Sequence, residues 1–277
     1  MTKKNINEMS FLDHLEDLRW HLIRSTLAIV IVGTVAFIFS RALFRLIIFA
    51  PLEMSFPTYR LLCKTAQFFN IESTFCGEEL PMIIQSRTMA GQFSADIWTS
   101  ITAGFVIAFP YVIYQFWKFI SPGLHDDERK HSRGFIIASS LLFFIGVLFG
   151  YYVVCPLSIN FLANYNISEV VDNQIDIGSY IGLVRSTALA SGFIFELPIV
   201  IYFLTKIGLV TPLFLRKYRK YALVIVLILS AIITPPDVAS QIIVAIPVLI
   251  LYEISIYISK IVIRNQERKI KKDVRTR

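Results

Sequence analysis

The sequence is poor in charged residues, which make up 17% of its 277 positions, against about 25% in an average soluble domain. Hydrophobic residues make up 55%, and the mean hydropathy is +0.63. This balance excludes an ordinary soluble domain, because so much apolar surface requires a bilayer around it. A net charge of +7 would suit a nucleic-acid-binding protein, but the basic residues gather between the apolar segments, so no nucleic-acid partner is expected.

Motifs for bond-breaking chemistry are also missing. No glycine is followed by lysine, which excludes a phosphate-binding P-loop, and no histidine pair has the HExxH spacing of a zinc site. No serine lies in the Gly-x-Ser-x-Gly turn of a hydrolase. The four histidines have no Cys or His neighbour at ligand spacing. We therefore expect no enzyme activity, no metal and no cofactor.

Long apolar segments are what the sequence has in abundance. They predict an all-α, polytopic membrane protein with six transmembrane helices, since about 20 apolar residues in a helix cross the hydrocarbon core. The predicted spans are 23–39, 97–119, 135–157, about 181–207, 221–233 and 238–258.

The last two predicted spans are irregular. The fifth is followed at once by residues 234–237, Thr-Pro-Pro-Asp, and covers only about 20 Å, which is too short for an unperturbed bilayer. The sixth is interrupted by Gln241, Pro247 and Glu253, which predicts a kink or a wet segment.

The basic residues predict the orientation of these spans. Twenty of them lie in the two terminal segments and the loops on one side, whereas five lie on the other side, all in one long outer loop at about 40–96. Because positive segments stay in the cytoplasm, both termini are predicted to be cytoplasmic. The expected domains are a cytoplasmic amphipathic segment, a transmembrane domain and a basic cytoplasmic tail, at 1–22, 23–262 and 263–277.

Two of the three cysteines, Cys63 and Cys76, lie in the predicted outer loop. A bacterial periplasm permits a disulfide there. Two unrelated cysteines in one loop are the alternative, and the sequence leaves both open. Cys155 lies inside the third predicted span, where we expect it to behave as a small buried hydrophobe.

Acidic residues on the predicted cytoplasmic face are unusual, because a surface near anionic lipid attracts basic residues. Residues 10–22 have the apolar stripe of a helix lying on the membrane, and Glu16 and Asp17 lie on its other face. Glu128 follows two aspartates in the loop after the second span. Two such groups would suit a pair of arginines, since guanidinium binds carboxylate through two parallel hydrogen bonds. Each group also has an alternative interpretation. The acids of 10–22 would be a solvated face with internal ion pairs, and those of the loop would cap the next helix.

Polar residues inside the spans form a second group. Glu196 and Glu253 would each cost about 2.5–3.5 kcal/mol at mid-bilayer, so each needs a partner or a wet cavity. Gln241 and Thr234, beside the short fifth span, are weaker signals of the same kind. One interpretation is contact with another subunit. Another is a secondary transporter in which the two glutamates relay protons or ions, and a passive scaffold is a third.

At these residues the sequence resembles the TatC family, the multispanning core of the twin-arginine (Tat) protein translocase. The motifs that carry the resemblance are HLEDLR at 14–19, FWKFISPGL at 116–124, ERK at 128–130, FELP at 195–198 and TPPD at 234–237, followed by Gln241, AIP at 245–247 and Glu253. They extend over nearly the whole chain. One position departs from the family, which usually has glutamate where this chain has Asp17.

The resemblance implies a signal-peptide receptor that exports folded proteins across a bacterial cytoplasmic (inner) membrane, driven by the proton motive force. It implies that the Arg-Arg pair of an export signal peptide binds Glu128 together with Asp17 or Glu16, near Phe119. It further implies a hetero-oligomer with single-span Tat partners of the TatA and TatB type, embedded in membrane lipid. The residues expected to contact these partners are Glu196, Thr234, Asp237, Gln241 and Glu253.

Overall fold

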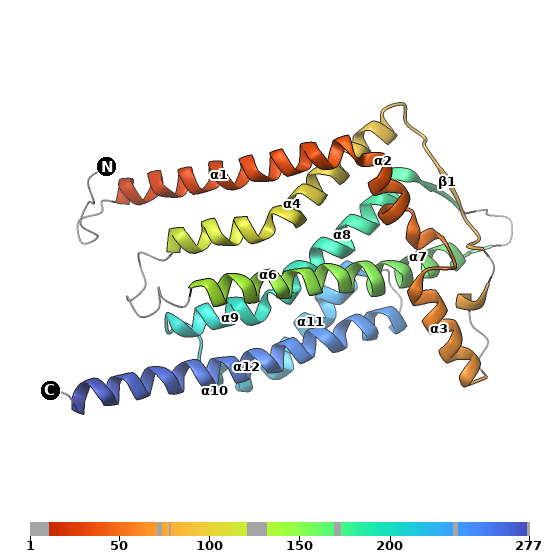
Figure 1. Ribbon diagram of the computed structural model, residues 1–277. Helices are drawn as coiled ribbons and strands as arrows, with labels where there is room; N and C mark the ends of the chain where they lie inside the picture. The colour runs from red at the N-terminus through yellow and green to blue at the C-terminus, as the bar shows by residue number, and fades with distance from the viewer. Residues whose placement is uncertain are drawn as a thin grey trace. The chain divides into compact units, whose positions relative to one another are not determined.

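The computed structural model describes residues 11–70, 74–77, 79–120, 132–168, 173–234 and 238–275. The helices, drawn in Figure 1, are α1 (Phe11–Ile38), α2 (Ser40–Leu43), α3 (Pro57–Phe68), α4 (Gly91–Ile120), α6 (Ser132–Phe149), α7 (Cys155–Asn164), α8 (Ile177–Phe195), α9 (Leu197–Lys206), α10 (Pro212–Lys217), α11 (Arg219–Ile233) and α12 (Val238–Arg275). The π-helical segments are η2 (Phe44–Ile48) and η6 (Gly150–Val154), and the 3-10 turns are η3 (Ala50–Leu52) and η4 (Thr74–Cys76). Strands β1 (Ile83–Gln85) and β2 (Gln174–Asp176) form a two-stranded sheet.

Within the described ranges, six helical segments are long and apolar enough to cross a membrane: 15–38, 40–68, 91–120, 134–164, 177–206 and 240–268. Five of these overlap predicted spans. The segment 40–68 lies instead in the predicted outer loop, where α2, η2, η3 and α3 follow one another as separate pieces. The predicted fifth span is α11, whose 15 residues extend only about 22 Å. The shortness expected of this helix is therefore present in the structure.

The helices differ from the expected spans mainly at their ends and breaks. The expected surface helix and first span form one continuous helix, α1, because neither glycine nor proline interrupts the chain between Phe11 and Val32. The third span is continuous with the π-helical segment η6, and the fourth breaks at Glu196. The helix α12 continues through Pro247 as a single element of 38 residues, so Pro247 does not end it. The expected kink or wet segment stays a prediction.

The chain divides into two compact units, which comprise residues 1–50, 84–144 and 175–185, and residues 51–83, 145–174 and 186–277. In the first unit, α1 packs along α4 (Figure 1). The two backbones approach closely at Gly33 and Gly104, where a Cβ added to Gly104 would come within 2.6 Å of the Gly33 nitrogen. Only glycine permits this approach, because any side chain would meet backbone atoms.

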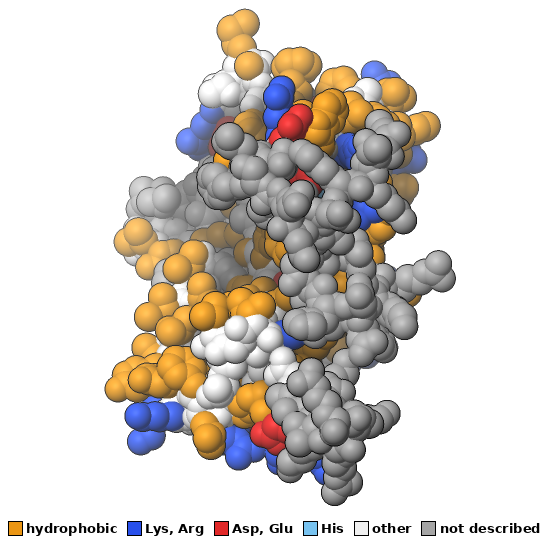
Figure 2. Space-filling model, turned by 90° about the vertical axis from the view of Figure 1, so that its left-hand side faces the viewer, with side chains coloured by type: hydrophobic (Ala, Val, Ile, Leu, Met, Phe, Trp, Pro, Cys, Tyr) orange, Lys and Arg blue, Asp and Glu red, His pale blue; other side chains and the backbone are white. Residues whose placement is uncertain are grey.

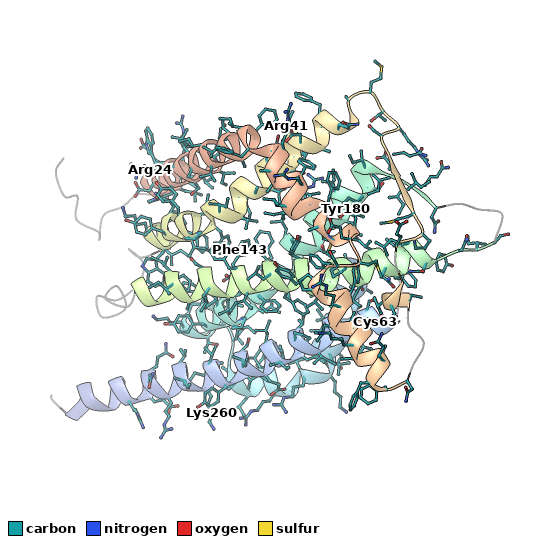
Figure 3. All side chains as sticks on the ribbon, turned by 45° about the vertical axis from the view of Figure 1, so that its right-hand side comes forward. Arg24, Arg41, Cys63, Phe143, Tyr180 and Lys260 are labelled. Atoms are coloured by element: carbon teal, nitrogen blue, oxygen red, sulfur yellow. A yellow bond between two sulfur atoms is a disulfide. The ribbon has the colours of Figure 1, made fainter. Side chains whose placement is uncertain are left out.

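Aromatic side chains fill the rest of the first unit. Phe143 of α6 is fully buried and stacks on Phe109 of α4, with 3.5 Å between the ring centroids. Tyr180 of α8 donates a 2.6 Å hydrogen bond to the carbonyl of Ile48. Phe143 and Tyr180 are labelled in Figure 3. These contacts join α4 to α6, and the start of α8 to η2.

In the second unit, α9 and α11 pack against α12 (Figure 1). Two buried clusters lie between these helices and α10, made of Ile201, Leu215 and Ile256, and of Val226, Ala245 and Val248. The hydroxyl of Thr205 donates a 2.9 Å hydrogen bond to that of Ser259, and Tyr252 donates one of 2.8 Å to the Leu215 carbonyl. Polar contacts therefore join the same helices as the apolar clusters.

The predicted outer loop contains an ordered helical cap, built from α3 and η4. Tyr59 of α3 is fully buried, and its hydroxyl lies 3.1 Å from the carbonyl oxygens of both Pro51 and Pro156. Cys63, labelled in Figure 3, forms a disulfide with Cys76, with 5.0 Å between the Cα atoms. The sequence had left this pairing open. The disulfide thus joins α3 to η4 within the cap, and the hydrogen bonds of Tyr59 attach the cap to Pro51 and to the start of α7.

Large hydrophobic side chains are exposed along most of the long helices, among them Leu27, Ile107, Leu141 and Ile228. Figure 2 shows such side chains reaching the surface, with Lys and Arg side chains among them. An apolar surface this extensive is typical of a protein surrounded by lipid.

Candidate functional site

The acids predicted on the cytoplasmic side lie near the start of α1. Glu16 and Asp17 are both exposed, as is the apolar side chain of Leu15. Neither carboxylate forms an ion pair with any residue that the structure describes. The expected alternative of internal ion pairs is therefore not seen in these ranges. Both carboxylates remain available to a cation from outside the chain.

A hydrogen bond holds this end of α1 against the end of α4. The Nδ1 atom of His21 lies 2.7 Å from Oε1 of Gln115, whose side chain is only 3% exposed. The His21 ring also meets the ring of Phe119 edge to face, with 6.4 Å between the centroids. Because Asp17 precedes His21 by four residues, it lies one helical turn away on the same side of α1. The structure therefore brings Asp17 and Phe119 to the same end of the α1–α4 pair.

Glu128, the third acid of the predicted site, lies outside the described residues. The helices that flank its loop are nevertheless joined, since Trp117 of α4 is buried against Phe135 of α6, with 4.6 Å between the ring centroids. The expectation that the loop connects two adjacent helix ends is consistent with this contact.

Glu196 lies in the break between α8 and α9 and is 8% exposed. Its backbone nitrogen donates a 3.1 Å hydrogen bond to the Phe193 carbonyl, and its own carbonyl accepts hydrogen bonds from the nitrogens of Ile199 and Val200. Pro198 explains the break, since proline suits the first turn of a new helix but lacks the N–H needed to continue an old one. The carboxyl oxygen Oε1 is fully buried, as expected for an acid enclosed by the protein.

The polar residues around α11 are occupied within the second unit. Thr234 is buried, and its hydroxyl donates a 2.8 Å hydrogen bond to the Ser230 carbonyl. Gln241 donates a 3.0 Å hydrogen bond to the Leu227 carbonyl, which joins α12 to α11. Asp237 lies outside the described residues. Helix joining, the milder role expected of Gln241, is present here.

Glu253 has an ion-pair partner within the chain. Its Oε2 atom lies 2.6 Å from Nη2 of Arg219, and these two side chains are 52% and 50% exposed. Arg219 begins α11, while Glu253 follows the first residue of α12 by 15 positions, or about 22 Å. The ion pair therefore joins the first residue of the short α11 to α12, and it supplies the partner that an acid inside a span requires.

Two functional candidates were missed by the sequence analysis. Gln115 carries a buried amide in the second span, and Arg185 carries a charge in the fourth. The signal for both was the one that identified Glu196, a polar side chain inside an otherwise apolar helix. The burial and the neighbours of these two side chains depend on how the helices pack, which the sequence alone does not show.

Comparisons with known proteins agree over nearly the whole chain. The family described as "Sec-independent protein translocase protein (TatC)" matches residues 13–247. The TatC protein of Blattabacterium sp. subsp. Periplaneta americana is 45% identical, over 93% of this chain and 97% of its own length. That of Aquifex aeolicus is 35% identical, over 94% and 98%.

Solved structures give the same result. One crystal structure of the twin arginine translocase receptor TatC has a TM-score of 0.65 at 33% identity, covering 90% of this chain and 99% of the other. A second, in DDM, has a TM-score of 0.68 at 36% identity, covering 89% and 99%.

Proposed function

Because the chain belongs to the TatC family of Sec-independent protein translocases, we propose that it is the signal-peptide receptor and membrane core of a twin-arginine translocase. It acts in a bacterial cytoplasmic membrane with both termini in the cytoplasm, and it exports folded proteins with the proton motive force. The observation that carries the proposal is the exposed pair Glu16 and Asp17, which has no ion pair with the described residues. Asp17 also lies one helical turn from His21, whose ring meets Phe119 of α4.

In this proposal, Asp17 or Glu16 receives one arginine of the signal peptide, and Glu128 receives the other. Guanidinium presents two parallel N–H groups to a carboxylate, whereas lysine presents a single ammonium group, so the site distinguishes Arg-Arg from Lys-Lys. Exposed ion pairs contribute only about 0–1 kcal/mol each. Apolar contacts must therefore add affinity, and we assign them to Phe119 and to the exposed Leu15.

A peptide-binding measurement tests these roles. The purified full-length protein in detergent is titrated with a fluorescent signal peptide that carries either Arg-Arg or Lys-Lys. Asp17→Asn, Glu16→Gln and Glu128→Gln each keep the side-chain shape and remove the charge. We expect at least one of the first two, and Glu128→Gln, to weaken Arg-Arg binding by up to about fivefold and to reduce the preference over Lys-Lys.

Glu79→Gln is the matched control, because Glu79 is exposed in the predicted outer loop and should not meet the peptide. Equal affinity of the unmodified protein for the two peptides would refute arginine recognition. Unchanged Arg-Arg binding by all three acidic variants would refute the assignment of the acids.

Contacts with single-span Tat partners form the second part of the proposal. We assign these contacts to the short α11 and to the break in the fourth span at Glu196. Gln241, whose amide bonds to the Leu227 carbonyl, holds α12 against α11 beside this surface. We expect Glu196→Ala to reduce site-specific crosslinking between the second unit and the partner spans. Glu196→Gln, which keeps the volume, shows whether charge or shape matters. Unaltered crosslinking by both variants would count against this contact.

The secondary-transporter alternative is not supported. The two relatives and the two crystal structures described above are TatC proteins. Glu253, one of the two residues assigned to an ion relay, is also paired with Arg219 within the chain.

A further inference from the structure

Arg185 is a cation inside α8 to which the proposed function assigns no role. Its side chain is half-buried, and its Nε atom is buried without a hydrogen-bond partner among the described residues. A charged side chain inside a span normally meets an opposite charge or extends to the membrane interface. We propose that Arg185 binds the phosphate group of a membrane phospholipid, in the leaflet nearer the start of α8. With the predicted orientation, this is the outer leaflet.

The depth of Arg185 favours a lipid phosphate. The segment 177–206 contains 30 residues and, with its break at Glu196, extends at most about 45 Å, so that up to about 7 Å projects beyond a centred hydrocarbon core of about 30 Å at each end. Arg185 follows Ile177 by eight residues, or about 12 Å. Its backbone therefore lies about 5 Å or somewhat more inside the hydrocarbon edge, a distance that a long arginine side chain can bridge to reach the interface.

The direction of the side chain favours the same leaflet. Side chains of an α-helix lean towards its N-terminus, so Arg185 leans towards Ile177 and the nearer interface. Towards the N-terminus, this side of α8 carries Gly182 and Gly178, which precede Arg185 by three and seven residues. A Cβ added to Gly182 would meet nothing within 4 Å, and Gly178 is exposed. We call these two residues the glycine strip, because they leave an open path along α8.

Asp176, at the far end of the glycine strip, is an acid that is already engaged. Its Oδ2 accepts a 2.9 Å hydrogen bond from the backbone nitrogen of Gly178, and its Oδ1 accepts one of 3.3 Å from that of Arg87. It also lies nine residues from Arg185, or about 13 Å along the axis. An anion from the bilayer is therefore the available partner, and phosphate accepts the paired N–H groups of guanidinium.

Native mass spectrometry of the full-length protein tests the proposal. Protein in detergent is titrated with phosphatidylglycerol, and the retained lipids are counted. We expect Arg185→Gln to weaken the tightest phosphatidylglycerol site about tenfold. Gly182→Leu should have a comparable effect although Arg185 is retained, because leucine fills the glycine strip. Arg60→Gln, a change of the same type at an exposed arginine of α3, should leave that site unchanged.

Two further ligands identify the source of the phosphate. Diacylglycerol, which has the acyl chains without phosphate, should show no dependence on Arg185. Inorganic phosphate at millimolar concentration should not displace the lipid. Equal lipid retention by Arg185→Gln and the unmodified protein would overturn the proposal. The proposal would also be overturned if Gly182→Leu lost crosslinking to the partner spans but retained lipid as the unmodified protein does. That result would assign the glycine strip to a protein helix instead.

Discussion

One hydrogen bond, between His21 and Gln115, joins α1 to α4 one helical turn after Asp17. Gln115 is almost completely buried, so its amide oxygen depends on His21 for a donor. The same histidine meets Phe119 and lies one turn from Asp17. The two side chains therefore position the groups that we assign to signal recognition, without contacting the signal themselves.

Removing one partner of this hydrogen bond while the other stays in place should destabilise the protein. We expect His21→Ala to lower the free energy of unfolding by about 1–3 kcal/mol, because it leaves a buried amide unsatisfied. The double variant His21→Ala with Gln115→Leu should recover most of that loss. Thermal unfolding in detergent measures both. Thr34→Ala removes an exposed hydroxyl bond within α1 and serves as a control, with an expected change below about 0.5 kcal/mol. Additive losses in the double variant would contradict the coupling.

Individual residues also show where sequence reasoning stops. Glu196 and Gln241 could be singled out in advance, because a polar group in an apolar helix is visible in the sequence. The partner of Glu253 could not be predicted, because its ion pair with Arg219 depends on how α11 packs against α12. The hydrogen bond of Gln115 joins residues 94 positions apart, which no local pattern predicts.

At the scale of elements, the contact between α1 and α4 depends on two glycines. We expect Gly104→Ala to destabilise the protein by about 1–3 kcal/mol, because the new Cβ would meet the backbone of Gly33. Gly134→Ala is the matched control. It introduces the same methyl group into α6, where nothing lies within 4 Å, and should stabilise the helix by about 0.5–1 kcal/mol. Similar unfolding temperatures for the two variants would contradict the close approach.

The cap should depend on its disulfide. Cys63 and Cys76 are 13 residues apart, and closing a loop of about this size contributes roughly 3 kcal/mol. We expect reductant to lower the unfolding temperature of the unmodified protein. Cys63→Ser should start at the lower temperature and show no response to reductant. Hydrogen exchange should place the loss of protection in α3, and an unchanged unfolding temperature would show that the cap does not need the bond.

Element types were predictable from apolar length, whereas breaks and junctions were not. The apolar run of 181–207 predicted one helix, and Pro198 with Glu196 divides it. At Pro247, by contrast, the helix α12 continues. Proline is tolerated inside a membrane helix because neighbouring groups can bond to the backbone carbonyl that it leaves without a partner. The helices of the outer loop were missed, because their apolar residues are divided among short pieces.

At the scale of the whole molecule, the uneven lengths of the helices should affect the surrounding lipid. At about 22 Å, α11 falls short of a hydrocarbon core of about 30 Å. We expect the bilayer to thin beside the second unit, which would lower the barrier to protein crossing. Protein reconstituted with lipids of different chain length should be most stable in the shorter ones. A thickness around the protein equal to that of bulk lipid, measured by neutron or X-ray scattering, would remove this idea.

The opposite mismatch occurs in α12, whose 38 residues form a rod of about 57 Å. In an upright orientation about 27 Å of this rod lies outside a hydrocarbon core of about 30 Å, and a tilt reduces this length. A fluorophore fused behind Arg275 would therefore stand clear of the headgroups, and its energy transfer to a dye-labelled lipid would report the tilt of the last span. The C-terminal end is thus a suitable attachment point for following the translocase at work, because a label there need not touch lipid.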